Sequence, residues 1–287
     1  MFISRLCSGI VLVIIAAITL LQGGYLLAAV LLFISLVAYR ELTKACGVHA
    51  GTAEAQGHDL HGKDRKINAL EGAGFLGIIC YYGAVVFSPG VTLQLLILLF
   101  VMMAFMFVYV FTFPKFQASQ VMSAYFCVIY APVMLSFIYE TRALTLGIYI
   151  VWMIFISSWI CDTCAYLTGM MIGRHKMAPK LSPKKSIEGA IGGIAGSALV
   201  GGLYGYFVVE QAASGQKIAW IYVVISAAGA VISQVGDLAA SAIKRNHDIK
   251  DYGHLIPGHG GIMDRFDSVI FTSPIIYALA LLLIRQM

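Results

Sequence analysis

Nine long apolar runs follow one another along this 287-residue chain, with polar segments between them. A bilayer core about 30 Å thick needs roughly 20 apolar residues per helix, and lipid offers no water to satisfy an open backbone. We therefore predict an all-α fold, a polytopic transmembrane helical bundle. The expected spans are 5–22, 24–42, 70–88, 91–113, 118–139, 143–172, 189–209, 217–240 and 269–286.

The composition supports the same class of protein. Hydrophobic residues make up 60% of the chain and charged residues 11%, whereas roughly a quarter of the residues in a soluble domain are charged. The first run follows Arg5 and resembles a signal peptide. Because further spans follow at once and no convincing small-residue cleavage site appears, we expect a retained first helix.

The six cysteines favour neither a disulfide framework nor a metal site. Most of them lie in apolar runs, where they resemble the small residues of membrane helices. Cys161 and Cys164 have the C-x-x-C spacing of redox and zinc motifs, but they lie inside a predicted span and no second pair accompanies them.

The placement of positive charge predicts the orientation in the membrane. With the N-terminus inside, sixteen of the 19 Lys and Arg residues fall on the cytoplasmic side, as the positive-inside rule requires. We therefore expect a multi-pass protein of the cell membrane (inner or plasma membrane). Residues 1–142 form N-terminal transmembrane helices with a flexible cytoplasmic loop at about 47–68, and residues 143–287 form a C-terminal region with its polar loops in the cytoplasm.

Glycines recur four residues apart in the segment 189–205, a spacing that lets helix backbones approach closely. The pairs are Gly189/Gly193, Gly192/Gly196 and Gly201/Gly205. Two interpretations remain open, namely tight packing within the chain and the seam of a homodimer.

Three polar clusters in the C-terminal half carry the candidate chemistry. The first is Asp162, deep in an apolar run, where a carboxylate costs about 2.5–3.5 kcal/mol on insertion scales and marks a functional candidate. A helix-packing hydrogen bond or a protonated acid is the alternative. The second is the segment 176–189, where Ser182-Pro183 predicts a helix N-cap beside an anion site. Its candidate residues are Lys180, Ser182, Lys184, Lys185 and Ser186.

The third cluster spans residues 237–267. If the eighth helix continues through the segment 236–248, one face carries Asp237, Ser241, Lys244, Arg245 and Asp248. Asp264 and Asp267 are three residues apart, which puts them on one helix face, and together with Asp237 they can hold Mg²⁺. The stretch contains four basic and five acidic residues, a balance that favours a site for both a metal and a polyanion over a loop that only fixes topology.

The residues of this stretch match a known signature. The run Ser241-x-x-Lys244-Arg245, then Lys250-Asp251-x-Gly253, then Pro257-x-His259-Gly260-Gly261-x-x-Asp264-Arg265-x-Asp267 resembles that of the phosphatidate cytidylyltransferases, or CDP-diacylglycerol synthases, of the bacterial type. The upstream segments 161–169 and 178–189 also resemble that family, which more often has glycine or alanine at the position of Cys161.

The resemblance implies an enzyme of phospholipid biosynthesis, a nucleotidyltransferase that converts CTP and phosphatidic acid into CDP-diacylglycerol and pyrophosphate in the bilayer, with Mg²⁺ and without a nucleic-acid partner. It implies a catalytic site that faces the cytoplasm from the region 143–287. The expected catalytic residues are Ser241, Lys244, Arg245 and Asp264, and the expected metal ligands are Asp237, Asp264 and Asp267. The expected substrate-binding residues are Asp162, Lys180, Ser182, Lys184, Lys185, Ser186, Lys250, His259, Gly260, Gly261 and Arg265.

Two other functions use similar features. A secondary transporter uses broken helices and intramembrane carboxylates, but it predicts paired features in both halves of the chain. A CDP-alcohol phosphotransferase would need Gly and Arg at the positions of Thr163 and Tyr166. A purely structural membrane scaffold would leave the pattern of Asp and Lys residues without a role.

Overall fold

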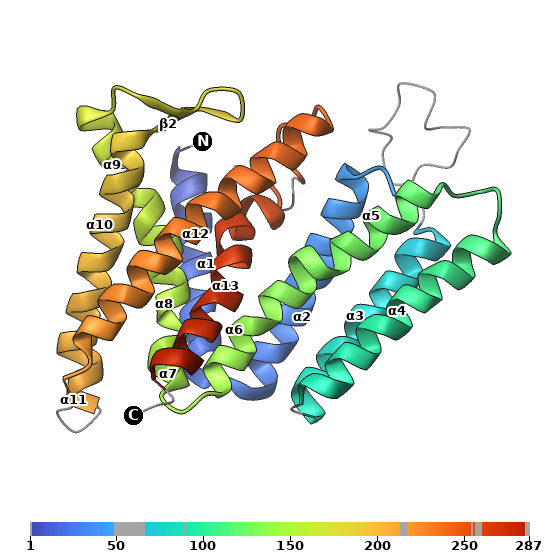
Figure 1. Cartoon of the computed structure of the whole chain (residues 1–287), viewed down its shortest axis with the longest axis horizontal. Helices are drawn as coiled ribbons and strands as arrows, with labels where there is room; N and C mark the ends of the chain where they lie inside the picture. Colours follow the sequence, from blue (N-terminus) through green and yellow to red (C-terminus); the bar gives the residue numbers. More distant parts are fainter. Residues whose placement is uncertain are drawn as a thin grey trace. The chain divides into compact units, whose positions relative to one another are not determined.

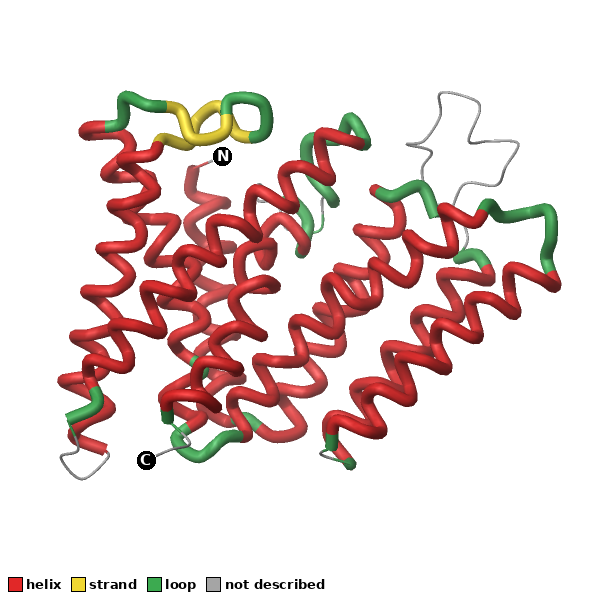
Figure 2. The backbone as a smooth tube through the Cα atoms, viewed as in Figure 1, coloured by secondary structure: helices red, strands yellow, loops and turns green. Residues whose placement is uncertain are grey.

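The computed structural model describes residues 2–48, 67–88, 90–212, 217–253, 255 and 260–284. Helices make up most of them (Figure 2). The α-helices are α1 (Phe2–Gln22), α2 (Gly24–Ala45), α3 (Ala69–Phe87), α4 (Val91–Phe111), α5 (Ala118–Val128), α6 (Met134–Ala143), α7 (Gly147–Ile150), α8 (Trp152–Phe155), α9 (Cys161–Ile172), α10 (Ile187–Tyr204), α11 (Glu210–Ala212), α12 (Ala219–Asn246) and α13 (Met263–Leu283). Three π-helical segments join some of them, η1 (Ile129–Val133), η2 (Ile156–Ile160) and η3 (Gly205–Val209).

Each of the nine predicted apolar runs is helical over most of its described residues, which confirms the fold class. Within the described residues, eight helical segments are long and apolar enough to cross a membrane, and Val11–Gln22 is a shorter apolar helix. The largest differences lie at the polar end of α12 and the start of α13, each about six residues beyond the predicted span. Hydropathy marks the part of a helix that lies in lipid, whereas backbone hydrogen bonding continues the helix into polar sequence.

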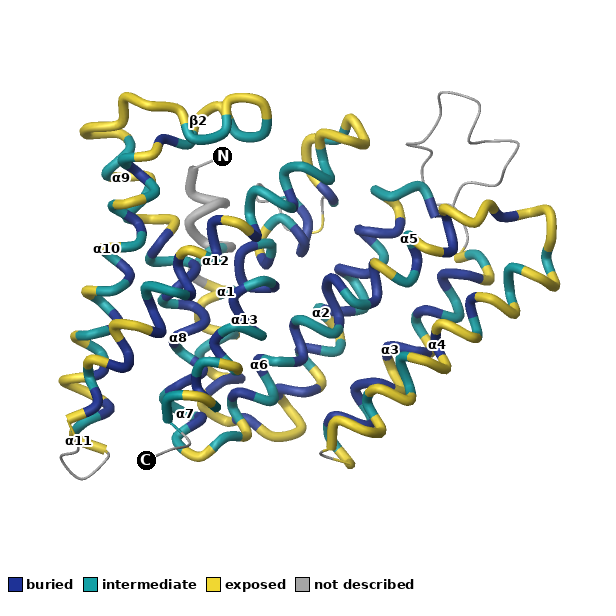
Figure 3. The backbone as a smooth tube through the Cα atoms, viewed as in Figure 1, coloured by how far each residue is buried: buried dark blue, intermediate teal, exposed yellow. Residues whose placement is uncertain are grey.

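The chain divides into two compact units, Met1–Ser136 with Asn246–Arg265, and Phe137–Arg245 with Phe266–Met287. In the first unit, α2, α3, α4 and α5 pack around buried aromatic side chains, and Gly74 makes room for the ring of Tyr39. The Ser35 and Tyr82 hydroxyls share a hydrogen bond of 2.7 Å. Helix α4 exposes most of its length (Figure 3), as an apolar helix does where it faces lipid.

In the second unit, α9 and α10 lie side by side and are joined by a hairpin (Figure 1). Glycines of α10 allow the close approach to α9: a Cβ on Gly193 would lie 2.8 Å from the Cys161 carbonyl oxygen, and one on Gly196 would lie 2.5 Å from Sγ of Cys164. Gly201 faces α12, where a Cβ would lie 2.5 Å from Cβ of Ser226. The small-residue pattern of α10 therefore serves packing within the chain. The homodimer stays a prediction.

The hairpin corrects one prediction. Ser182 is not a helix N-cap, because Ser182–Ser186 forms strand β2, which pairs antiparallel with β1 (Lys176–Ala178). The N-cap of α10 is Ser186, whose hydroxyl accepts a hydrogen bond of 3.2 Å from the Gly189 amide. Pro183 is compatible with a two-stranded sheet because both strands are edges, where a missing N–H does no harm.

A second correction concerns Asp248. Helix α12 ends at Asn246, so Asp248 does not share its face with Asp237. Asp248 has a positive φ of 52°, a left-handed conformation that short polar side chains such as Asp tolerate. The turn therefore removes one acid from the predicted charged face.

Candidate active site

An ion pair joins the hairpin to α12. The Nζ atom of Lys185 contacts Oδ2 of Asp237, and each side chain is 25% exposed. The Nζ atom is shielded from solvent and has no hydrogen-bond acceptor of suitable geometry among the described residues. The Asp237 carboxylate is therefore the charge that compensates it, since a buried ammonium group needs an anionic partner.

Two further carboxylates lie within electrostatic range of Asp237. Asp162 of α9 lies within electrostatic reach of Asp237 and Lys185, and the Ser268 hydroxyl hydrogen-bonds to it. Asp267 of α13 lies within reach of Asp237, Asp162 and Lys244. Helices α9, α12 and α13 and strand β2 thus contribute three acids and two lysines to one cluster within the second unit.

The charge balance of this cluster favours a cation. The cluster combines three acidic side chains with two lysines, so its acidic groups outnumber its basic groups. Among the described residues, no three His, Cys, Asp or Glu side chains are placed to hold a metal ion together. Mg²⁺ commonly takes only one or two carboxylates and completes its shell with water and phosphates. The donor set therefore fits an ion that binds together with a phosphate ligand.

Asp264 has a different environment, in the other unit. Its Oδ2 atom accepts hydrogen bonds from the backbone amides of Tyr252, at 2.8 Å, and Gly261, at 3.1 Å. Gly260 has a φ of +84°, and a Cβ there would lie 3.0 Å from the same oxygen. Asp264 thus fixes the end of the glycine-rich stretch that leads into α13.

Sequence reasoning missed Glu41 of α2. This side chain is only 8% exposed, and its carboxylate accepts hydrogen bonds from the amides of Ile262, at 3.1 Å, and Met263, at 2.9 Å. An acid inside the apolar run 24–42 is the same signal that identified Asp162, but Glu41 stands beside Arg40 and Lys44 and resembles an ordinary interfacial residue.

The other predicted residues vary in exposure. Ser241, Lys244, Ser182 and Gly260 are partly buried, and Ser186 and Gly261 are buried. Lys180, Lys184, Arg245, Lys250 and Arg265 are exposed, and His259 lies outside the described residues. At the base of the hairpin, the Glu188 carboxylate accepts from the amides of Arg174 and His175, and its Oε1 lies 2.5 Å from Nδ1 of His175.

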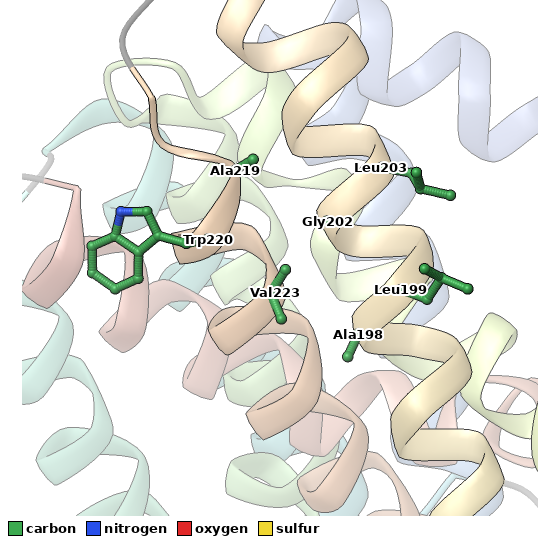
Figure 4. Close-up of a pocket in the computed structure, with 7 residues that line it drawn as sticks. All are labelled: Ala198, Leu199, Gly202, Leu203, Ala219, Trp220 and Val223. Atoms are coloured by element: carbon green, nitrogen blue, oxygen red, sulfur yellow. The ribbon is translucent and has the colours of Figure 1, made fainter.

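A cavity of about 350 Å³ lies elsewhere in the second unit, between α10 and α12. Figure 4 shows Ala198 of α10 and Val223 of α12 facing each other across it. Its lining consists of Ala198, Leu199, Gly202, Leu203, Ala219, Trp220 and Val223. With no charged group in that lining, the cavity does not suit a nucleotide, and it is separate from the cluster around Asp237.

The fold and the cluster define a class, a polytopic helical membrane protein with a carboxylate and lysine site on its C-terminal helices. The chain belongs to the cytidylyltransferase family, whose sequence model matches residues 3–283. This match confirms the resemblance that the signature indicated.

Curated relatives agree with the family. The chain is 40% identical over 158 residues to a phosphatidate cytidylyltransferase of Staphylococcus aureus (strain COL). It is 37% identical over 158 residues to proteins of the same name from Staphylococcus saprophyticus and Staphylococcus epidermidis. Each alignment covers 54% of this chain and 58% of the relative, so the chain spans less than two thirds of the length of the relatives it matches.

Proposed function

We propose that this chain transfers a cytidylyl group from CTP to phosphatidic acid and releases CDP-diacylglycerol and pyrophosphate. The observation that carries the proposal is the Lys185–Asp237 ion pair, with two further carboxylates within electrostatic range of Asp237, in a member of the cytidylyltransferase family. The apolar helices suit a lipid substrate and a bacterial cell membrane, and the positive charge of the polar loops supports a site that faces the cytoplasm.

The chemistry follows from the charges of the reactants. A phosphate oxygen of phosphatidic acid attacks the α-phosphorus of CTP, a new P–O bond forms, and the bond from that phosphorus to the β-phosphate oxygen breaks. The electron pair leaves with pyrophosphate. The attacking phosphate monoester is already ionised near neutral pH, because its second pKa is about 6, so no strong general base is needed.

Repulsion between two polyanions is the main barrier that the protein must lower. Lys185 is held in place by Asp237, and Lys244 lies within electrostatic reach of Asp267. Cations that are fixed before the reaction hold both phosphates in line and stabilise charge on the departing pyrophosphate. Exposed Lys180, Lys184 and Arg245 stand outside the ion pair, where we assign them to attracting and orienting the anionic substrates.

Asp237 and Asp267 are the residues we assign to holding Mg²⁺, with Asp162 beside them. When bound, Mg²⁺ neutralises phosphate charge. Asp264 is assigned here to the backbone of the glycine-rich stretch, because its Oδ2 atom already accepts two amide hydrogens. The proposed metal site therefore has Asp237 and Asp267 as ligands, whereas the sequence pattern predicts Asp264 as a third ligand.

The competing functions fit less well. A transporter built from repeats needs matching polar features in both halves, whereas the described cluster of Asp162, Asp237 and Asp267 lies in one unit. An alcohol phosphotransferase lacks support because Thr163 and Tyr166 replace the residues it needs.

The proposal is tested with the full chain purified in detergent. Incubation with CTP, phosphatidic acid and Mg²⁺ is expected to give CDP-diacylglycerol and one equivalent of pyrophosphate, with no product when EDTA replaces Mg²⁺. A Lys185→Ala variant that elutes as a folded protein is the control for contaminating activity. Product at the same rate from both proteins would remove this cluster from the reaction.

A further inference from the structure

The N-terminus of α13 is bound by an acid from a distant part of the chain. The Glu41 carboxylate of α2 accepts both the Ile262 and the Met263 amides, across 221 and 222 residues of sequence. The first amides of a helix have no partner within the helix, and a carboxylate there also interacts favourably with the helix dipole. Glu41 therefore supplies from another helix what a local N-cap residue usually supplies.

Two glycines of the signature, Gly253 and Gly261, leave the space that this carboxylate occupies. A Cβ on Gly261 would lie 2.5 Å from Oε2 of Glu41 and 2.6 Å from its Oε1, and a Cβ on Gly253 would overlap Oε1. Real Cβ atoms do not approach that closely, so any side chain at either position would displace Glu41. Glu41, Gly253 and Gly261 thus form one packed group in the first unit, in which Glu41 and Gly261 are buried and Gly253 is half-buried.

Glu41 and Asp264 each accept hydrogen bonds from two backbone amides of the signature region. Asp264 accepts from Tyr252 and Gly261, and Glu41 accepts from Ile262 and Met263. The two carboxylates lie close enough for the charge of Asp264 to act on Glu41. Two like charges remain together in a buried place only when donors compensate them, so the four amides and the two acids stabilise one another.

We propose that Glu41 is a positioning residue of the reaction. It accepts the amides of Ile262 and Met263 and packs against Gly253 and Gly261, and so fixes where α13 begins and how Asp264 is presented. The inference rests on the proposed function and adds to it a residue outside the C-terminal signature. Loss of Glu41 leaves the ion pair of Lys185 and Asp237 intact but lets the signature backbone relax, which lowers turnover because small misplacements at a reacting site are costly.

Glu71 provides a matched control. It is also a buried glutamate, 4% exposed, and it also serves a helix N-terminus, since its Oε2 accepts the Asn68 amide at the start of α3. Its second oxygen accepts from Thr43 of α2. Glu71→Gln therefore removes the same charge from a similar environment, away from the signature.

The experiment compares Glu41→Gln with Glu71→Gln in the full chain. Steady-state rates are measured with CTP varied, and amide hydrogen exchange is followed in a peptide that covers residues 260–264. For Glu41→Gln we expect kcat/KM for CTP to fall by about tenfold or more and exchange in that peptide to speed up by about tenfold. For Glu71→Gln we expect a lower melting temperature with KM for CTP and exchange at 260–264 unchanged.

A double-mutant cycle covers the case in which Glu41→Gln folds poorly. Gly261→Ala alone is expected to lower the melting temperature strongly, because its methyl group meets the Glu41 carboxylate. In the Glu41→Ala background that methyl group has room, so the effect of Gly261→Ala on melting temperature should shrink. Additive effects in this cycle, or a Glu41→Gln variant that loses activity only in proportion to its folded fraction, would overturn the inference. If the wild-type chain transfers no cytidylyl group, the proposed function fails by itself, and the exchange rates and the cycle still decide whether Glu41 holds this backbone.

Discussion

Lys185 of the hairpin strand β2 pairs with Asp237 of α12, and Lys184, its neighbour along the same strand, is exposed. Adjacent residues of a strand point to opposite faces, so two lysines that look equivalent in sequence have different surroundings. Lys185 is paired with Asp237 and lies within electrostatic range of Asp162, whereas Lys184 is exposed. This difference sets distinct expectations for the two side chains.

Lys185→Ala is expected to lower kcat and kcat/KM together, each by about a hundredfold or more, because a cation that acts on the transition state affects both. Lys184→Ala should mainly raise the apparent KM for CTP. Its effect should diminish with added salt, since exposed charges are screened. Steady-state kinetics at two salt concentrations measure both. Equal losses for the two variants would contradict the assignment of the half-buried Lys185 to the reaction.

Lys244→Ala should resemble Lys185→Ala, because Lys244 lies within electrostatic reach of Asp267. We expect a loss of kcat with CTP varied and again with phosphatidic acid varied. Arg245→Ala is the neighbouring control, with an exposed side chain on the same helix end. If Lys244→Ala keeps its kcat and changes only KM, Lys244 acts in substrate binding and not in the chemical step.

Variants of the aspartates are expected to differ in the Mg²⁺ concentration that gives half-maximal rate. Asp237→Asn and Asp267→Asn should raise the Mg²⁺ concentration needed for half-maximal rate by about tenfold, since each removes a ligand charge. Asp264→Asn should lower the rate at saturating Mg²⁺ while the midpoint stays near that of the wild type, because Asp264 holds backbone amides. A shifted Mg²⁺ midpoint for Asp264→Asn alone would show that Asp264 is a metal ligand.

Gly193→Ala is expected to destabilise the protein by about 1–3 kcal/mol through overpacking. Its new methyl group would meet the Cys161 carbonyl oxygen at 2.8 Å and the Ala165 methyl at 3.0 Å. Gly83→Ala in α3 is the same substitution where nothing lies within 4 Å, so the higher helix propensity of alanine should leave stability equal or up to about 1 kcal/mol higher. Thermal unfolding in detergent measures both. A Gly193→Ala variant as stable as the wild type would show that α9 and α10 lie too far apart for this contact.

The orientation is tested with single cysteines at positions 184 and 250, both exposed, in a chain whose six native cysteines are replaced. A membrane-impermeant thiol reagent should label neither in intact cells and both in inverted vesicles. Labelling of both from outside would reverse the topology that the distribution of Lys and Arg predicts.

The sequence predicts the helices well because burial in lipid demands long apolar runs, and each run became a helix. It identifies Asp162 because a carboxylate among apolar residues is costly without a role. It identifies Asp237 and Asp267 because helix spacing puts them on charged faces of a polar stretch that matches a known signature. The hairpin was missed because Lys176–Ala178 and Ser182–Ser186 are short and polar, with no alternation to mark a strand. Glu41 was missed because its partners, Ile262 and Met263, are more than 200 residues away, and only the folded chain brings them together.

The direct test of the central claim follows two radioactive phosphates of CTP. The full chain in detergent is incubated with phosphatidic acid, Mg²⁺ and CTP labelled at either the α- or the γ-phosphate, and the lipid phase is extracted. Cytidylyl transfer predicts that the α label enters the lipid phase and that the γ label is converted from CTP to pyrophosphate in the aqueous phase, with both products formed about a hundredfold more slowly by Lys185→Ala. A γ label in the lipid, which would indicate phosphorylation, or no label in the lipid from a folded wild-type chain, would contradict the account.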